Sequence, residues 1–375
     1  MYAREGQMSD NNTSDDGEYP APHLDIRQLR KLCYSKRLNF LLGAGASQPA
    51  IPTLTDGQEP KELIDQIRQV SCKLAAGSVL AEEEMDTLGA YVRFISMIIS
   101  ILSMSNSRAV PRSANIFTTN YDLFIEAAMD QVMQENYGVI FNDGANGYFR
   151  RYINTFNYDR STALRGQFDN YNHETPTIRL IKPHGSINWR QSKADKDQEL
   201  IEVLSQPVEN PFLVLPDANE SEHTMESRHF FEMLRLFNIE LDKPQSILFV
   251  IGFSFQDKHI KGMVQRALQN PGLQVCIFAY SDETSKPDTG NARKDILNNL
   301  GTISNSNLLI LSPKDVANCV INLGKHDPPH ADSKSTENKT DSIRLNLKTV
   351  TRLLMPNNAD SFPILAQADS GRGSK

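Results

Sequence analysis

The stretch "LNFLLGAGASQPAIPTL" at residues 38–54 governs how the chain is organised, because a run of apolar residues breaks there into closely spaced glycines. The apolar run predicts a buried strand at Leu38–Leu42, and Gly43 and Gly45 predict a tight bend directly after it. Such a bend has two interpretations. It is an ordinary turn, or it is a loop whose backbone N–H groups approach a phosphate at a helix N-terminus.

Apolar strands alternate with helical patterns along most of the chain. The expected strands after the first are 115–120, 177–182, 211–216, 246–255, 273–280 and 307–312. The expected helices are 24–36, 123–134, 224–241, 257–268, 290–300 and 313–323. Continuous apolar strands between helices are typical of a parallel sheet that is covered on both faces. The fold class is therefore α/β, with a Rossmann-like, doubly wound parallel sheet.

The chain also divides into regions. We expect a disordered polar leader at 1–22, one domain at 23–325 and a polar tail at 326–375, with surface loops at 141–175. Residues 61–110 show a helical pattern without strand signals, which predicts a helical module inserted into the domain. Its segment 91–104 is apolar on nearly every side, so either its own domain or a second copy must cover it. The segment 343–354 either docks on a partner or packs on its own domain.

Composition narrows the classes of protein. The net charge of −7 argues against a broadly basic surface, so direct nucleic-acid binding is expected to be weak or absent. The four cysteines form no C-x-x-C pair, which gives a structural zinc site built from cysteines no support. No metal site is expected, and cysteines that look unpaired suit a reducing cytoplasm. The longest apolar run, at 94–104, is too short to span a membrane.

Four motifs lie at the carboxyl ends of four of the expected strands. They are Gly43-Ala44-Gly45-Ala46-Ser47, Thr118-Thr119-Asn120-Tyr121-Asp122, Lys182-Pro183-His184-Gly185-Ser186 and Gly252-Phe253-Ser254-Phe255. Ligands of doubly wound sheets bind beyond the carboxyl ends of the strands. The four motifs are therefore expected to meet around one binding site.

Each motif carries groups that suit a ligand, and each has a plainer interpretation. Asn120 offers a donor and an acceptor to ribose hydroxyls, and Asp122 offers an acceptor to a carboxamide; alternatively, Asp122 caps the following helix. His184 is a usable base near neutral pH, or else a core histidine bonded to the backbone. The pair Asp257 and His259 is interpreted as a helix cap.

Taken together and in this order, the motifs resemble those of the sirtuin-like superfamily over residues 30–325. The matching residues are Gly43, Ala44, Gly45, Ser47, Thr118, Asn120, Asp122, His184, Gly185, Gly252 and Ser254. The resemblance implies an NAD+ site in which the bond between nicotinamide and ribose is cleaved. It also implies that the glycine bend holds the pyrophosphate.

The chain departs from deacylase sirtuins in two ways: it has no four-cysteine zinc ribbon, and residues 49–54 lack their Asp-Phe-Arg sequence. The stretches "IFTTNYD", "KPHGSINW" and "GFSFQDKHI" resemble instead the sirtuin-like NADases of bacterial antiphage defence. In its compact length, the chain resembles the subunit that is encoded beside the HerA ATPase. These resemblances imply a cytoplasmic homo-oligomer that works with a HerA-type ATPase and depletes NAD+.

By the same resemblance, Asn120 fixes the ribose and the attacking water, Asp122 binds the carboxamide, and His184 takes a proton. The chemistry requires no metal. The expected activity is thus that of an NAD+ glycohydrolase. Two alternatives stay open: an NAD-dependent protein deacylase, and a non-catalytic module that binds NAD+ or ADP-ribose.

Overall fold

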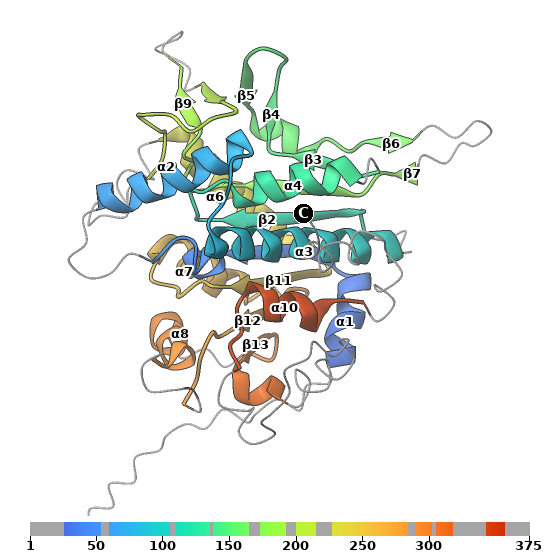
Figure 1. Cartoon of the computed structure of the whole chain (residues 1–375). Helices are drawn as coiled ribbons and strands as arrows, with labels where there is room; N and C mark the ends of the chain where they lie inside the picture. The colour runs from blue at the N-terminus through green and yellow to red at the C-terminus, as the bar shows by residue number, and fades with distance from the viewer. Residues whose placement is uncertain are drawn as a thin grey trace, which may run out of the picture.

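The computed structural model describes residues 26–53, 60–105, 110–135, 138–164, 173–192, 200–214, 227–283, 285, 290–301, 305–317 and 343–356. The expected leader at 1–22 and much of the expected tail lie outside these residues. Within them the chain forms an α/β fold, in which helices cover both faces of a central sheet (Figure 1).

The central sheet has seven parallel strands in the order β13-β12-β11-β1-β2-β8-β3. They are β1 (Arg37–Leu42), β2 (Ser113–Thr118), β3 (Ile140–Asn142), β8 (Thr177–Ile181), β11 (Ser246–Ile251), β12 (Gln274–Phe278) and β13 (Leu308–Leu311). Leu42 at the end of β1 pairs with Thr118 on one side and with Ile251 on the other. The strands therefore end in line, and the predicted doubly wound sheet is confirmed.

Alternate residues of each strand supply the two hydrophobic cores. Phe40 and its neighbours pack on one face, and Leu41 and its neighbours pack on the other. The first face is covered by α1 (Ile26–Ser35), α2 (Pro60–Ala76), α3 (Glu82–Met104), α4 (Phe124–Glu135) and α10 (Leu347–Leu354). The second is covered by α6 (Arg228–Asp242), α7 (Lys258–Ala267) and α8 (Ala292–Leu300).

Two sequence-based expectations are wrong. The strand expected at 211–216 is reduced to an isolated bridge between Leu213 and Gly185. The region 141–175, expected to be loops, contains several short elements. They are β3, β4 (Ala145–Asn146), β5 (Arg151–Ile153), the 3-10 helix η2 (Thr155–Asp159), β6 (Ala163–Leu164) and β7 (His173–Glu174). Strands of two or three residues are too short to show an alternation of apolar and polar residues in the sequence. β4 and β5 pair with each other, and β5 also pairs with β10 (Ile201–Val203), which with β9 (Trp189–Gln191) completes a second sheet.

The inserted helical module consists of α2 and α3, which lie between β1 and β2 in the chain. The apolar helix α3 packs on α4, α10, α1 and β2, and Ile95 is fully buried while Ile99 is 6% exposed. Its own domain thus covers it, and the interpretation of this helix as a self-association surface is corrected. By length and composition α3 is apolar enough to cross a membrane. However, 72% of its apolar 18-residue stretch is buried inside the fold.

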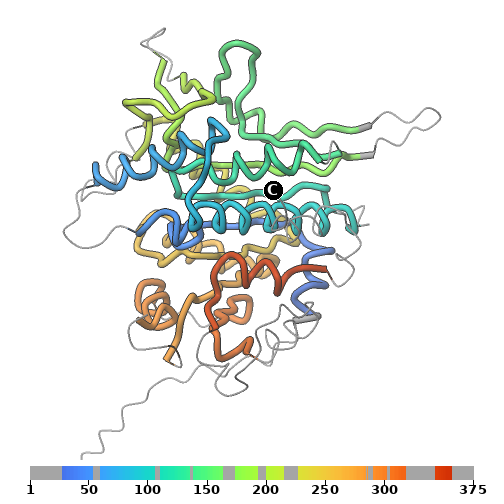
Figure 2. The backbone as a smooth tube through the Cα atoms, viewed as in Figure 1, coloured from blue at the N-terminus to red at the C-terminus, as the bar shows by residue number. Residues whose placement is uncertain are grey.

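The segment 343–354 also packs on its own domain. Residues 347–354 form α10, whose apolar side chains are buried against α3 and α1. Figure 2 shows this helix, in red, beside the blue helix α1 at the other end of the described chain. The Arg30 guanidinium on α1 donates to the carbonyl oxygen of Leu353 at 2.9 Å.

We expect Ile95→Ala to lower the free energy of unfolding by about 2–5 kcal/mol, because a fully buried side chain is replaced by a cavity. Urea unfolding measures this. The control is Val79→Ala, at a side chain that is 93% exposed, and its effect should stay within about 0.5 kcal/mol. Unchanged stability of the Ile95 variant together with a smaller particle in sedimentation would place Ile95 in an interface between copies instead.

Candidate functional site

The carboxyl ends of β1, β2, β8 and β11 surround one pocket of about 450 Å³, a size typical of ligand sites. Most of the residues selected from the sequence line this pocket: Ala44, Gly45, Ser47, Asn120, Asp122, His184, Gly252 and Ser254. The buried residues Gly43 and Thr118 do not line it and lie behind its wall. Thr118 accepts a hydrogen bond from the N–H of Asn120 at 3.1 Å and so supports that part of the wall.

The glycine bend after β1 continues as the 3-10 helix η1 (Ala44–Ser47) and packs tightly against the loop after β11. A Cβ atom on Gly43 would lie 2.4 Å from the carbonyl oxygen of Gly252. The N–H of Gly43 donates to Ile251, that of Gly45 to Gly252, and that of Ala46 back to Gly43. The glycine spacing is therefore required by contact between two loops, and these three N–H groups already have protein acceptors.

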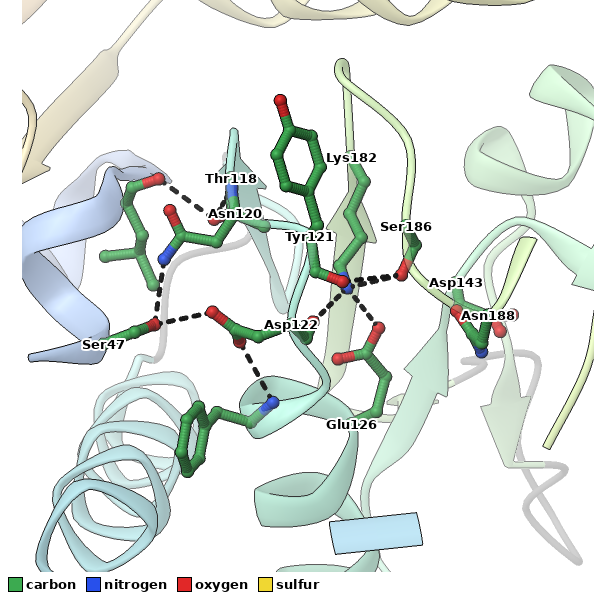
Figure 3. A network of polar contacts seen from close by, with 12 residues as sticks. Ser47, Thr118, Asn120, Tyr121, Asp122, Glu126, Asp143, Lys182, Ser186 and Asn188 are labelled. Atoms are coloured by element: carbon green, nitrogen blue, oxygen red, sulfur yellow. Dashed lines mark hydrogen bonds and ion pairs between the residues drawn. The ribbon is translucent and has the colours of Figure 1, made fainter. Parts of the chain in front are cut away.

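The Ser47 hydroxyl is the centre of a buried hydrogen-bond network (Figure 3). It donates to Asp122 Oδ2 at 2.8 Å and accepts from Asn120 Nδ2 at 3.0 Å. The Tyr91 hydroxyl lies 2.9 Å from it. The proton of Ser47 therefore goes to Asp122 in this arrangement.

The same network fixes the side-chain amide of Asn120. Its Nδ2 donates to Ser47 and also to the carbonyl oxygen of Gly43 at 3.1 Å, so both amide hydrogens are used. Within the described part of the chain, no donor reaches Oδ1. Asn120 therefore offers an oriented acceptor to a ligand in the pocket.

Asp122 forms an Asx turn that leads into α4, the place where one of its two interpretations put a helix cap. Its Oδ1 accepts from the N–H of Phe124 at 3.2 Å, and its Oδ2 accepts from Ser47. Burial raises the pKa of Asp122, although the Lys182 charge and the Ser47 hydrogen bond oppose the rise. Binding of a carboxamide by the remaining lone pairs stays a prediction.

Lys182 lies beneath the pocket, 1% exposed, and was not selected from the sequence as a site residue. Its ammonium group contacts Glu126 Oε1 at 2.7 Å, the Asp122 carbonyl oxygen at 2.6 Å and Ser186 Oγ at 2.9 Å (Figure 3). Burial raises the pKa of Glu126, and the Lys182 charge opposes this. The ammonium thus ties the turn after β2 to the turn after β8.

His184 faces Asp257, and the sequence did not predict this contact. Its Nε2 lies 3.0 Å from Asp257 Oδ2, while Asp257 Oδ1 caps α7 by accepting from the N–H groups of His259 and Ile260. Burial raises the pKa of Asp257, but the hydrogen bond and charge of His184, with the two N–H groups, hold it below its ordinary value. The capping interpretation is confirmed, and the contact with His184 adds a histidine–carboxylate pair.

Gly185 fixes the backbone of its neighbour His184. Its φ of +85° lies in the left-handed region, and a Cβ atom there would lie 2.3 Å from the carbonyl oxygen of Phe212. The N–H of Val214 donates to the His184 carbonyl oxygen at 2.9 Å. The segment expected to be a strand at 211–216 thus holds the histidine in place.

In the part of the chain that the structure describes, no group of three or more His, Cys, Asp and Glu side chains is arranged to hold a metal ion. The described cysteines, Cys33, Cys72 and Cys276, are free thiols. Burial raises the pKa of Cys33 to about 12, which keeps it protonated. The polar groups that line the pocket include Asn120, Asp122 and the His184–Asp257 pair.

We expect Lys182→Met to lower the free energy of unfolding by about 3–5 kcal/mol, because the buried acceptors around the ammonium lose their cation. Chemical denaturation measures the loss. The control is Lys73→Met, which breaks a pair with Glu84 in which the lysine is 41% exposed and should lose less than about 1 kcal/mol. Equal losses in the two variants would show that Lys182 is not a tie between the two turns.

Stability should depend on the ionisation of Asp257. Because its pKa in the folded chain lies below the ordinary 3.8, ionised Asp257 stabilises the fold above that pH, and the contribution is lost as the pH falls through the folded pKa. Asp257→Asn keeps a helix-capping oxygen but cannot ionise. Between about pH 5 and about pH 3, the parent should lose more unfolding free energy than this variant. Parallel pH profiles would contradict the assignment.

Comparisons with known proteins give one family match and several matches to solved structures. A model of the SIR2-like domain matches residues 114–302, a little over half of the chain. The match includes Asn120, His184 and Gly252 but begins after the glycine bend. No curated protein matches the chain.

Solved structures of low sequence identity also match. They include a Sir2 homolog–NAD complex (14% identity, TM-score 0.33, covering 74% of this chain and 93% of that one). A second is a Sir2 histidine mutant with a p53 peptide and NAD (12% identity, TM-score 0.36, covering 81% of this chain and 100% of that one). A third is Sir2 with an inhibitor, 2′-O-acetyl-ADP-ribose and a deacetylated p53 peptide (13% identity, TM-score 0.33, covering 80% of this chain and 100% of that one). With its domain match across β2 to α8, the chain belongs to the SIR2-like family.

Proposed function

We propose that the chain is an NAD+ glycohydrolase, which hydrolyses NAD+ to nicotinamide and ADP-ribose. The observation that carries the proposal is the convergence of the Asn120 Oδ1 acceptor and the His184–Asp257 pair in one pocket at the strand ends. Membership of the SIR2-like family supports NAD+ as the ligand.

The chemistry needs few groups. The bond between ribose C1′ and the nicotinamide nitrogen breaks, its electron pair leaves with neutral nicotinamide, and an oxocarbenium-like ribose remains. Water then adds to C1′ and loses a proton. Asn120 Oδ1 accepts a hydrogen bond from the water or from a ribose hydroxyl and so positions it. His184 takes the proton, and the ionised Asp257 stabilises the imidazolium that forms.

The site also favours hydrolysis over protein deacylation. Residues 49–54 lack the Asp-Phe-Arg sequence of deacylase sirtuins. Among them, Ile51, Pro52 and Thr53 line the pocket and bring no charged group to it. Asn120 and His184 are both present in the pocket, which favours an enzyme over a module that only binds NAD+ or ADP-ribose.

On the resemblance of its motifs, we place this activity in the cytoplasm and in antiphage defence by NAD+ depletion, in a homo-oligomer with a HerA-type ATPase. Because α3 is buried in its own domain, another surface must join the copies. Co-expression with the ATPase, followed by native mass spectrometry and an NAD+ assay, tests the partnership. Separate particles with unchanged NADase activity would overturn it.

We expect His184→Ala to reduce kcat/KM for NAD+ by about 10²–10⁴-fold, because the proton acceptor is lost. Nicotinamide release, followed by chromatography with the HerA-type ATPase present and absent, measures this. The control is His259→Ala on α7, outside the pocket, which should keep the parent rate.

Three outcomes would contradict the proposal. A His184 variant with the parent rate would remove the histidine from the mechanism. NAD-dependent deacetylation of an acetyl-lysine peptide, without nicotinamide release in the absence of peptide, would identify a deacylase. Binding of NAD+ without turnover under all conditions would identify a binding module.

A further inference from the structure

We propose that the C-terminal segment 343–346 completes a subsite for the adenosine half of the dinucleotide, with the Asn346 amide as a hydrogen-bond donor. The inference rests on the proposed function, because that function fixes which end of the pocket holds nicotinamide. It concerns the opposite end of the pocket, beyond the residues assigned to the chemistry.

The topology of the sheet determines where the adenosine half must lie. His184 follows β8, and the neighbours from there are β2, β1, β11 and β12. At about 4.8 Å per strand, four steps span about 19 Å, which suits an extended dinucleotide. With its nicotinamide ribose at Asn120 and His184, the ligand crosses the ends of β1 and β11 and reaches Phe278 and Tyr280 at the end of β12.

This far end has the lining that a purine ring requires. Phe278, Tyr280, Ile296 and Leu345 contribute apolar and aromatic surface to the pocket wall, and such surface binds a flat base by stacking and burial. Leu345 comes from the C-terminal segment and the other three from β12, the residues after it and α8. The wall is therefore incomplete without the C-terminal segment.

The segment is firmly attached at this place. The N–H of Leu345 donates to the Tyr280 carbonyl oxygen at 3.2 Å, and the Arg344 guanidinium lies 6.0 Å from the centre of the Tyr280 ring. The following helix α10 buries Leu347 and Val350 in the core. The wall residues are thus held from both sides and are in place before a ligand binds.

Asn346 has a side chain whose orientation is set by the helix it caps. Its Oδ1 accepts from the N–H of Thr349 at 2.9 Å and from the Thr349 hydroxyl at 3.0 Å. Since the oxygen is used in the cap, the Nδ2 hydrogens remain, and no described residue accepts from them. Asn346 lines the pocket, so its amide can donate to a ring nitrogen of adenine or to a ribose oxygen.

Substitutions that keep the cap separate binding from stability. Ser and Asp both cap helices as well as Asn does, but neither presents an amide donor. We expect Asn346→Ser and Asn346→Asp to weaken AMP and ADP-ribose binding at least about tenfold, with melting temperatures unchanged and nicotinamide mononucleotide affinity unchanged. Titration calorimetry on the full chain measures all three ligands. Asn154→Asp, which changes the exposed cap of η2, is the matched control and should bind like the parent.

The outcomes separate this inference from the proposed function. A parent chain that binds none of the three nucleotides, nor NAD+, overturns the proposed function and the subsite with it. A parent that binds NAD+ and ADP-ribose, with variants that bind them equally well, overturns the subsite alone. Equal weakening of AMP and nicotinamide mononucleotide would also overturn it, because Asn346 would then not distinguish the two ends.

Discussion

The arrangement of the site depends on one buried cation. The Lys182 ammonium is shielded from water and is stable there only because the Glu126 carboxylate, the Asp122 carbonyl and the Ser186 hydroxyl surround it. Two of these acceptors belong to the turns that carry Asn120 and His184. The separation of the two side chains that face the ligand is therefore fixed by an interaction outside the pocket.

The sheet and the positions of the motifs could be predicted because their signals are local. Each long strand is a continuous apolar run, and the carboxyl ends of parallel strands necessarily meet. The partners of these motifs could not be predicted, because they come from distant elements: Asp257 reaches His184 from α7, and Asn346 reaches the pocket from the C-terminal segment. The burial of α3 likewise depends on α10, β3 depends on pairing with β8, and β5 depends on pairing with β10.

The glycine bend shows why one pattern had two interpretations. A loop that receives a phosphate and a loop that packs against another backbone both require the absence of a Cβ atom. Here Gly43 and Gly45 approach the backbone of Gly252, and their N–H groups donate to carbonyl oxygens of β11 and its loop. The bend is thus shaped by contact between two loops, while Ala44, Gly45 and Ser47 line the pocket. Binding of the NAD+ pyrophosphate there stays a prediction.

The route of the chain through this fold also affects its biosynthesis. The first strand, β1, pairs with β11, and the pocket includes residues 345 and 346, so segments from both ends of the domain meet at one place. Contacts that are so distant in sequence form only after most of the polypeptide has left the ribosome. A nascent chain from which residues 345 and 346 have not yet emerged therefore lacks a complete nucleotide pocket.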